Sequence, residues 1–346
     1  MPVFPNLAAK LLLFFELCKI VQTFFFIYLH ICKKSCIFAV KFDFMEQTTL
    51  TTQTEAIAST AANEQNWTTV IKPRNKLLAV DLGEIWRYRD LLTLFVKRNI
   101  ITQYKQTVLG PLWFFIQPIM TVVMYMVVFN GIAGIGTDNR PQTLFYLAGI
   151  CCWQYFSDCL TKSSNTFLSN ANIFGKVYFP RLISPLSDVI SNLVRFGIQF
   201  ALFLIVYAYY LIWPGNFTIE PNWTLCLVPL LIVMLAGLAL GFGILFSSMT
   251  TKYRDLQVLL SFFVSLWMYA TPVIYPLSTI TNPKIKLVMM LNPVTGIVEF
   301  FKYGFLGASN PPEWWMLGYS FGFMVVLLAF GIVVFNKVQR SFMDTV

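Results

Sequence analysis

Long apolar segments, each bounded by polar or charged residues, follow one another after residue 110 and constrain the fold of this chain most strongly. A helix needs about 20 apolar residues to cross a bilayer core of about 30 Å. Only 12% of the residues are charged, against about 25% in soluble domains. The sequence therefore predicts an all-α integral membrane protein over 110–346 with six transmembrane helices. We place these spans at 112–133, 143–164, 188–212, 223–249, 256–276 and 314–336.

The Lys and Arg residues between the spans indicate the orientation of the chain. Cytoplasmic loops are enriched in Lys and Arg. If the N-terminus is cytosolic, the outer connections hold only Arg140, Lys284, Lys286 and Lys302. We therefore expect both ends of the main body in the cytosol, and attribute the net charge of +9 to topology rather than to a nucleic-acid partner. The inner connections hold Lys72, Arg74, Lys76, Arg87, Arg89, Lys97, Arg98, Lys105, Lys162, Lys176, Arg181, Lys252, Arg254, Lys337 and Arg340.

The first 81 residues precede this main body and divide at Met45. Residues 1–44 are rich in Phe, Leu and Lys, and their longest uncharged run, 20–32, is short for a span. We expect 1–44 to be upstream translation or a leader, with Met45 as the natural start; the alternative is an extra membrane-associated helix. Residues 45–81 are polar and Thr-, Gln- and Ala-rich, which predicts a disordered cytosolic N-terminus.

Residues 82–109 are predicted to form an amphipathic helix in the membrane interface. Apolar residues recur there at helical spacing, and cations fall largely between them. Gly110-Pro111 ends this helix, because proline lacks the amide donor and restricts the residue before it. Trp113 then marks the start of the first span. The apolar positions are Leu82, Ile85, Trp86, Leu91, Leu92, Phe95, Val96, Ile100 and Ile101.

Several motifs occur in a characteristic order, and together they resemble the membrane permeases of type-2 ABC exporters. The resemblance is to the exporters of O-antigen, teichoic acid or capsule-like polysaccharide, and it covers about 82–340. The motifs are "RDLLTLFVKRNIITQYKQTVLGPLWFFIQP" (89–118), "NANIFGKVYFPRLISPLSDV" (170–189), "SSMTTKYRDLQ" (247–257), "TPVIYP" (271–276) and "LNPVTGIVEFFKYGFLG" (291–307).

The resemblance implies a complex of two permease copies and two copies of an ABC ATPase. The conduit would lie at the interface of the permease homodimer, in the inner membrane of a bacterium. The substrate would be a lipid-linked polysaccharide such as O-antigen, which connects the chain to lipopolysaccharide biosynthesis.

No ATP-binding motif occurs in the chain. A P-loop needs G-x-x-x-x-G-K-[ST], whose backbone amides hold the phosphates; Gly175-Lys176 lacks the upstream glycine, and we interpret the glycine-rich 131–136 as a turn. We therefore expect a transport subunit rather than an enzyme, with no cofactor of its own and with ATP and Mg on the partner ATPase. His30, Cys32 and Cys36 have a loosely metal-like spacing, but we expect no metal site there.

The connection around "NIFGKVYFPRLISP" is our candidate surface for ATPase docking. It gathers apolar and aromatic residues in a predicted cytosolic loop, and exposed apolar patches usually mark partner surfaces. Folding of the loop into the head-group layer is the alternative. The candidates are Ile173, Phe174, Lys176, Tyr178, Phe179 and Arg181, with Glu84 and Arg87 on the interfacial helix.

Charged and aromatic side chains within the spans are candidates for the transport path. Asp158 and Arg195 could form a structural pair, or Arg195 could meet a substrate phosphate. Aromatic rings can stack on the apolar faces of sugars without reading the hydroxyl pattern. Our channel-lining candidates are Trp153, Tyr155, Phe156, Trp267, Tyr269 and Tyr275, against the alternative that most of them pack in the bundle or face lipid.

The outer segment 281–310 is apolar but interrupted by Pro283 and Pro293. Its two parts are too short to span separately, so we expect short re-entrant or interfacial helices before the last span. Glu299 and Lys302, three residues apart, are expected to pair. The resemblance implies that these helices line the outer mouth of the conduit.

Two other functions remain open from the sequence. A type-2 ABC exporter of a small lipid or drug would share the fold. A membrane-embedded glycosyl- or acyltransferase would need His or paired carboxylates at a membrane face, but the sole His30 lies in the doubtful leader.

Overall fold

The part of the chain that the computed structural model describes forms helices and contains no strand. The predictions for 1–44, for 45–81 and for the Gly110–Pro111 joint lie outside it. The described residues are 82–105, 112–138, 140–174, 176–213, 221–251, 253, 255–307 and 311–345.

The helices follow one another with short connections. In chain order they are α3 (Leu82–Arg87), α4 (Arg89–Tyr104), α5 (Trp113–Tyr125), the π-helical η2 (Met126–Ile132), α6 (Gln142–Ser164), α7 (Thr166–Phe174), α8 (Ile183–Ile212), the 3₁₀ turn η3 (Trp223–Leu227), α9 (Val228–Thr250), α10 (Leu256–Tyr269), η4 (Leu277–Thr279), α11 (Pro283–Met290), α12 (Pro293–Leu306) and α13 (Trp314–Thr345).

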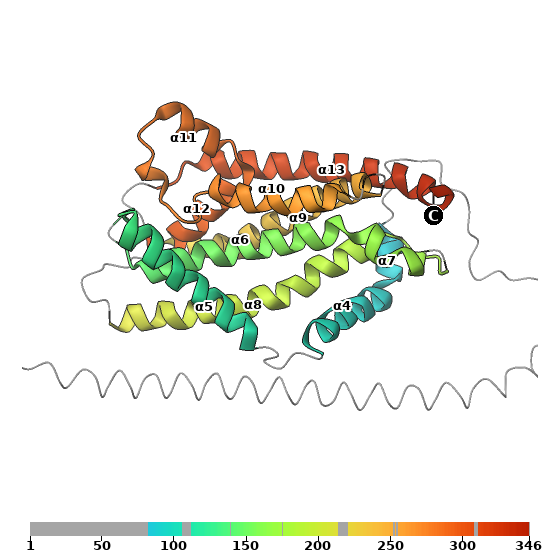
Figure 1. Ribbon diagram of the computed structural model, residues 1–346, viewed down its shortest axis with the longest axis horizontal. Helices are drawn as coiled ribbons and strands as arrows, with labels where there is room; N and C mark the ends of the chain where they lie inside the picture. The colour runs from blue at the N-terminus through green and yellow to red at the C-terminus, as the bar shows by residue number, and fades with distance from the viewer. Residues whose placement is uncertain are drawn as a thin grey trace, which may run out of the picture. The chain divides into compact units, whose positions relative to one another are not determined.

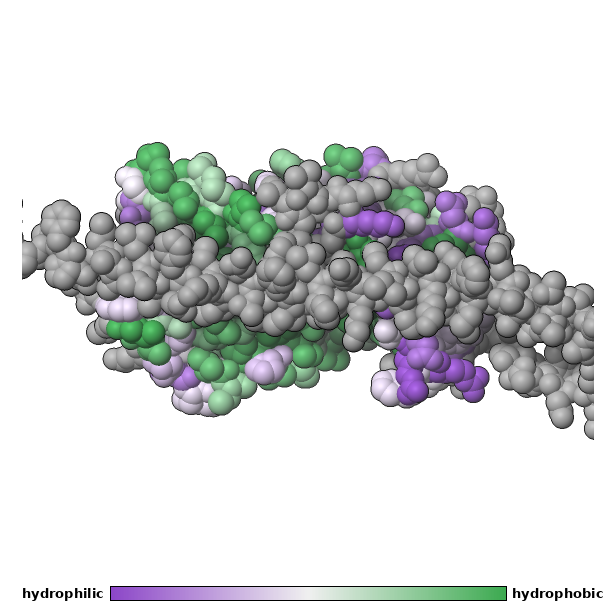
Figure 2. Space-filling view, turned by 90° about the horizontal axis from the view of Figure 1, so that it is seen from below, coloured by the Kyte–Doolittle hydropathy of each residue, from purple (hydrophilic) through white to green (hydrophobic). Residues whose placement is uncertain are grey.

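Helices α6, α8, α9, α10 and α13 run roughly along one direction, and α5 crosses them obliquely (Figure 1). Helices α11 and α12 lie at one end of this bundle, here called the α12 end. Helices α4 and α7 and the last turns of α13 lie at the opposite end, the α7 end. Figure 2 shows hydrophobic side chains over much of the bundle's length, with hydrophilic ones gathered toward the side where α4 lies.

Among the described residues, four helical segments are long and apolar enough to cross a membrane: Trp113–Ile132, Ile183–Ile212, Trp223–Thr250 and Trp314–Gln339. They coincide with four of the six predicted spans. The segment 142–164 is helical over 23 residues but carries Gln154, Asp158 and Lys162. The fifth span was predicted over 256–276, but the helix found there, α10, has only 14 residues. The prediction of a multi-pass membrane protein is therefore confirmed, whereas the count of six spans remains a prediction.

Helix α6 carries polar residues because it occupies the centre of the bundle. It contacts α5, α8, α9, α10 and α12, and most of its side chains are buried, including Leu144, Phe156 and Leu160. A helix surrounded by protein finds hydrogen-bond partners that lipid cannot offer. Its polar side chains are therefore compatible with a place inside a membrane bundle.

Glycines allow α6 to approach its neighbours closely. A Cβ added to Gly243 of α9 would lie 2.4 Å from the Cβ of Ser163 on α6. A Cβ added to Gly149 of α6 would lie 2.6 Å from the carbonyl oxygen of Val273. Such contacts are the small-residue packing that brings helices together in membranes.

Two Asn-Pro pairs begin the short helices of the α12 end. The side chains of Asn282 and Asn292 accept hydrogen bonds from the backbone N–H groups of Lys284 and Val294, both at 3.1 Å. Each asparagine is an N-cap, and the following proline occupies the first helical position, where its missing N–H costs nothing. The prolines that the sequence analysis interpreted as breakers therefore start α11 and α12.

The helix predicted over 82–109 is divided at Tyr88 into α3 and α4. One face of α4 packs on the bundle: Phe95 is 5% exposed and meets Phe179 with ring centroids 5.5 Å apart. On other faces Leu94 and Ile101 are exposed. The apolar residues of α4 are thus shared between protein and surroundings, and its place in a membrane interface stays a prediction.

Candidate functional site

An aromatic cluster fills the α7 end of the bundle. Phe174 and Phe179 are 3% and 4% exposed, and their ring centroids lie 5.5 Å apart. They pack with Phe95 of α4, Phe167 of α7 and Phe335 of α13, the last two stacked at 4.7 Å. The expectation that Phe174 and Phe179 form an exposed patch is therefore wrong, because α4 and α13 cover them.

The exposed part of this connection is its tip. Lys176 is exposed, and Val177 and Tyr178 are 59% and 54% exposed. Ile173 is half-buried. A small surface with an apolar centre and a cationic edge therefore remains on the loop, which we call the 176–178 tip.

Arg181 holds the loop against the last helix. Its guanidinium donates a hydrogen bond of 2.8 Å to the backbone carbonyl of Gln339 and lies over the Phe174 ring, 5.5 Å from the centroid. The side chain is 8% exposed, and burial lowers the pKa of its guanidinium. Arg181 was predicted to lie on the docking surface. In the structure it instead links the loop to α13 through its hydrogen bond to Gln339.

Polar side chains join α4 to the bundle through contacts that were not predicted from the sequence. Asn99 donates a hydrogen bond of 2.8 Å to the Asp188 carboxylate of α8. Lys162 of α6 lies 3.5 Å from the Gln103 side-chain oxygen and 2.8 Å from that of Asn192. The sequence feature that could have indicated these contacts is the presence of polar residues in otherwise apolar spans.

Of the secondary docking candidates on α3, Arg87 is exposed and Glu84 is half-buried.

Asp158 and Arg195 form the structural pair that was one of the two expected alternatives. A guanidinium nitrogen of Arg195 lies 2.7 Å from an Asp158 carboxylate oxygen, with side chains 12% and 18% exposed. Gln154 donates to Asp158 at 3.0 Å, and Arg195 donates to Gln117 of α5 at 3.0 Å. Asp158 lies on α6, Arg195 on α8 and Gln117 on α5, so these contacts connect the three helices.

Three of the aromatic candidates lie inside the protomer. Trp153, Tyr155 and Phe156 are 5%, 3% and 0% exposed. The Phe156 ring meets that of Trp267 at 5.2 Å, and Trp153 meets Trp267 at 6.4 Å. These three rings line no open surface of the protomer in this conformation, because α8 and α10 cover them.

The other aromatic candidates reach the surface. Tyr269 is 53% exposed, and its backbone carbonyl accepts a hydrogen bond of 2.7 Å from the Tyr275 hydroxyl. Trp267 is partly buried at the edge of the core. These residues are available to a partner or substrate, and a role in the conduit stays a prediction.

A buried lysine stabilises the α12 end. Lys302 is 2% exposed, and its ammonium donates to the carbonyl oxygens of Pro272 and Val273 at 2.5 and 3.1 Å. It also lies 3.7 Å from the centroid of the Phe145 ring. Burial lowers the pKa of Lys302, whereas the nearby Glu299 carboxylate raises it. Among the described residues no ion pair or hydrogen bond joins Glu299 to Lys302 as the sequence predicted, and the hydrogen bonds of Lys302 go to backbone carbonyls.

The described residues include no group of three His, Cys, Asp or Glu placed to hold a metal ion. What they present instead is structural charge inside the bundle and apolar surface outside it.

Comparison with known proteins shows which family the chain matches. The model of the ABC-2 type transporter family matches residues 90–306. The O-antigen export system permease protein RfbA of Myxococcus xanthus is 27% identical over 76% of this chain and 98% of its own length. An O-antigen export system permease protein RfbA of Klebsiella pneumoniae is 26% identical over 74% and 94%. The inner membrane transport permease YadH of Escherichia coli K12 is 25% identical over 65% and 87%.

Proposed function

The chain belongs to the ABC-2 type transporter family, and on this premise we propose that it exports a lipid-linked polysaccharide of the O-antigen class across the bacterial inner membrane. The observation that carries the proposal is the similarity to O-antigen export permeases over nearly their whole length. The chain is a membrane transport subunit and not an enzyme. The energy would come from ATP and Mg on a separate ABC ATPase, present in two copies beside two copies of this chain.

The proposed topology has six spans, with α6 and α10 added to the four apolar ones. At 1.5 Å per residue, the 23 residues of α6 extend roughly 35 Å, enough to cross a bilayer core. Helix α10 is shorter, and the turns at 270–276 would complete its crossing. The α7 end would be cytosolic, with α3 and α4 in the interface, and α11 and α12 would be re-entrant at the outer face.

The 176–178 tip is the proposed ATPase contact. A coupling surface must project from the bundle yet remain firmly joined to it. The buried Phe174–Phe179 cluster and the Arg181 contact with α13 supply that attachment, while Val177 and Tyr178 supply exposed apolar area. A displacement of the tip would pass to α4 and α13 through these contacts.

The conduit is proposed at the face that carries Tyr269, Tyr275 and the edge of Trp267, where a second copy would complete it. Exposed apolar side chains of α10, including Phe262 at 66% exposed, continue this face. Rings there would offer sugars stacking surfaces that tolerate different hydroxyl patterns. Passage of a lipid-linked polymer needs this tolerance more than it needs specific hydrogen bonds.

Deletion of the gene in its own host, with complementation, tests the function. We expect loss of surface polysaccharide together with accumulation of the same polymer inside the cell, restored by the wild-type gene. Tyr269→Ala/Tyr275→Ala should restore short polymers better than long ones, because a long chain occupies more stacking contacts. Val326→Ala, on an exposed position of α13, is the matched control and should restore both.

An unchanged surface polymer in the deletion strain would contradict the proposal. If efflux of a small lipid or drug were lost instead, the family assignment would stand and the substrate class would change. The measured quantities are the amount and length distribution of surface and internal polysaccharide.

A further inference from the structure

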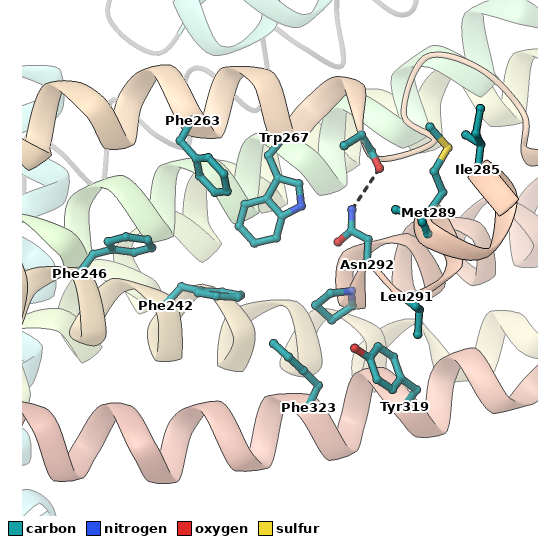
Figure 3. A pocket seen from close by; sticks show the side chains of 13 residues that line it. Phe242, Phe246, Phe263, Trp267, Ile285, Met289, Leu291, Asn292, Tyr319 and Phe323 are labelled. Atoms are coloured by element: carbon teal, nitrogen blue, oxygen red, sulfur yellow. Dashed lines mark hydrogen bonds between the residues drawn. The ribbon is translucent and has the colours of Figure 1, made fainter.

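A groove opens on the side of the bundle between α10 and α13, with α9 as its floor (Figure 3). It encloses a cavity of about 500 Å³, within the range of roughly 300–1,000 Å³ for ligand pockets. Figure 3 shows Phe263 and Trp267 of α10 facing Tyr319 and Phe323 of α13 across it. The groove exists because α10 packs on α6 and α9 and stands apart from α13.

The walls of this groove are almost wholly apolar. Phe242 and Phe246 line its floor, and Ile285 and Met289 of α11 close one end. The Asn292 side chain is already used, since its amide donates to Ala270 and Thr271 and its oxygen caps α12. Apart from the Tyr319 hydroxyl and the Trp267 indole N–H, the lining side chains offer a polar ligand no free partner, so the groove suits a hydrocarbon chain.

The rim at the α12 end carries positive charge. Lys284 and Lys286 flank Ile285 on α11, whose side chain lines the groove. Among the described residues neither ammonium group has a hydrogen-bond or ion-pair partner. A hydrocarbon groove with two lysines at its end complements an amphiphile that has an acyl chain and a phosphate head group.

We propose that this groove holds one acyl chain of an anionic bilayer phospholipid, whose phosphate lies at Lys284 and Lys286. The occupant is a resident lipid of the membrane rather than the exported substrate. Since Trp267 forms the wall between the groove and the Trp153–Phe156 core, the lipid would support α10 against the bundle where the helices themselves leave a gap. This inference goes beyond the proposed function and does not depend on it.

Native mass spectrometry of the full chain from nanodiscs tests the site. The discs contain equimolar phosphatidylglycerol and phosphatidylcholine. We expect wild type to retain phosphatidylglycerol at least about fivefold over phosphatidylcholine, from the attraction of two lysines. Lys284→Gln/Lys286→Gln should remove this preference while a lipid is still retained.

A substitution that fills the groove provides the second test of the proposal. Val288→Trp places a ring on a lining residue that is 68% exposed, and it should reduce lipid retention severalfold. Val326→Trp, at 69% exposure on α13 outside the groove, is the matched control and should retain lipid like wild type. Thermal unfolding and size exclusion verify that both variants fold; if Val288→Trp does not, Ala270→Leu replaces it.

Photo-crosslinking locates the chain directly. Phosphatidylglycerol with a diazirine in its acyl chain should label peptides of α10, α11 and α13 that contain lining residues. Labelling confined to other helices, or equal retention in all variants, would overturn the proposal. Recovery of the lipid carrier of a glycan in place of phospholipid would overturn the assignment to a resident lipid, whatever the outcome of the export assay.

Discussion

At the scale of single residues, the bundle contains charges whose removal should have very different effects. The Asp158–Arg195 pair lies between α5, α6 and α8 with side chains less than a fifth exposed. The Arg89–Asp90 pair is longer, at 3.9 Å, and its side chains are 63% and 96% exposed. A buried charge that loses its partner keeps its desolvation penalty, whereas an exposed one returns to water.

We predict that Asp158→Asn or Arg195→Gln lowers the free energy of unfolding by about 3 kcal/mol. The double substitution should cost less than the sum of the two, because it leaves no unpaired charge. Asp90→Asn is the control and should change stability by less than about 0.5 kcal/mol. Thermal and denaturant unfolding in detergent measure these differences. Additive losses would show that the two side chains act independently.

At the scale of helices, contact between α6 and α9 depends on glycine. Gly243→Ala would place a methyl group 2.4 Å from the Ser163 Cβ on the facing helix. Gly322 of α13 has no heavy atom within 4 Å of an added Cβ. The same substitution therefore tests packing at one position and only helix propensity at the other.

Gly243→Ala should destabilise the protein by about 1–3 kcal/mol through overpacking. Gly322→Ala should be neutral or slightly stabilising, because alanine favours helix. Expression level and unfolding temperature provide the measurements. Equal tolerance at both positions would mean that α6 and α9 can separate without loss.

In the loop after α7, different residues attach the loop to the bundle and make the proposed contact with the ATPase. Val177→Asp/Tyr178→Asp changes only exposed side chains and should abolish co-purification of the ATPase while unfolding remains that of wild type. Phe174→Asp should instead destabilise the permease, since it buries a charge in the α7-end cluster. Pull-down of the ATPase combined with thermal unfolding distinguishes the two. Undiminished pull-down from the tip variant would exclude the 176–178 tip as the contact.

At the scale of the whole molecule, a native cysteine can report orientation. Among the described cysteines Cys226 is exposed, whereas Cys151, Cys152 and Cys159 are buried. Cys226 lies in η3, which packs on α12. The proposed topology puts it on the outer side of the membrane.

A membrane-impermeant maleimide should therefore label Cys226 in intact spheroplasts, in a background where Cys18, Cys32 and Cys36 are serine. A cysteine introduced as Lys176→Cys, with Cys226→Ser, should react only after the membrane is permeabilised. Mass shift on a gel provides the measurement. Labelling of the 176 position in intact spheroplasts would reverse the orientation.

The sequence by itself determined the long apolar helices and their order, because an apolar run acts locally. It did not indicate α7, the division at Tyr88 or the Asn-Pro starts of α11 and α12. It also carried the family motifs, and it singled out Asp158 and Arg195 but left open whether they pair or Arg195 meets a substrate phosphate; the structure shows the pair. Only the tertiary structure decided that Phe174 and Phe179 are buried, since Phe95 and Phe335 come from distant parts of the chain. It likewise decided that Trp153 faces the core and that Lys302 bonds to backbone. Burial is a property of neighbouring helices, and a residue's own segment cannot specify which neighbour will cover it.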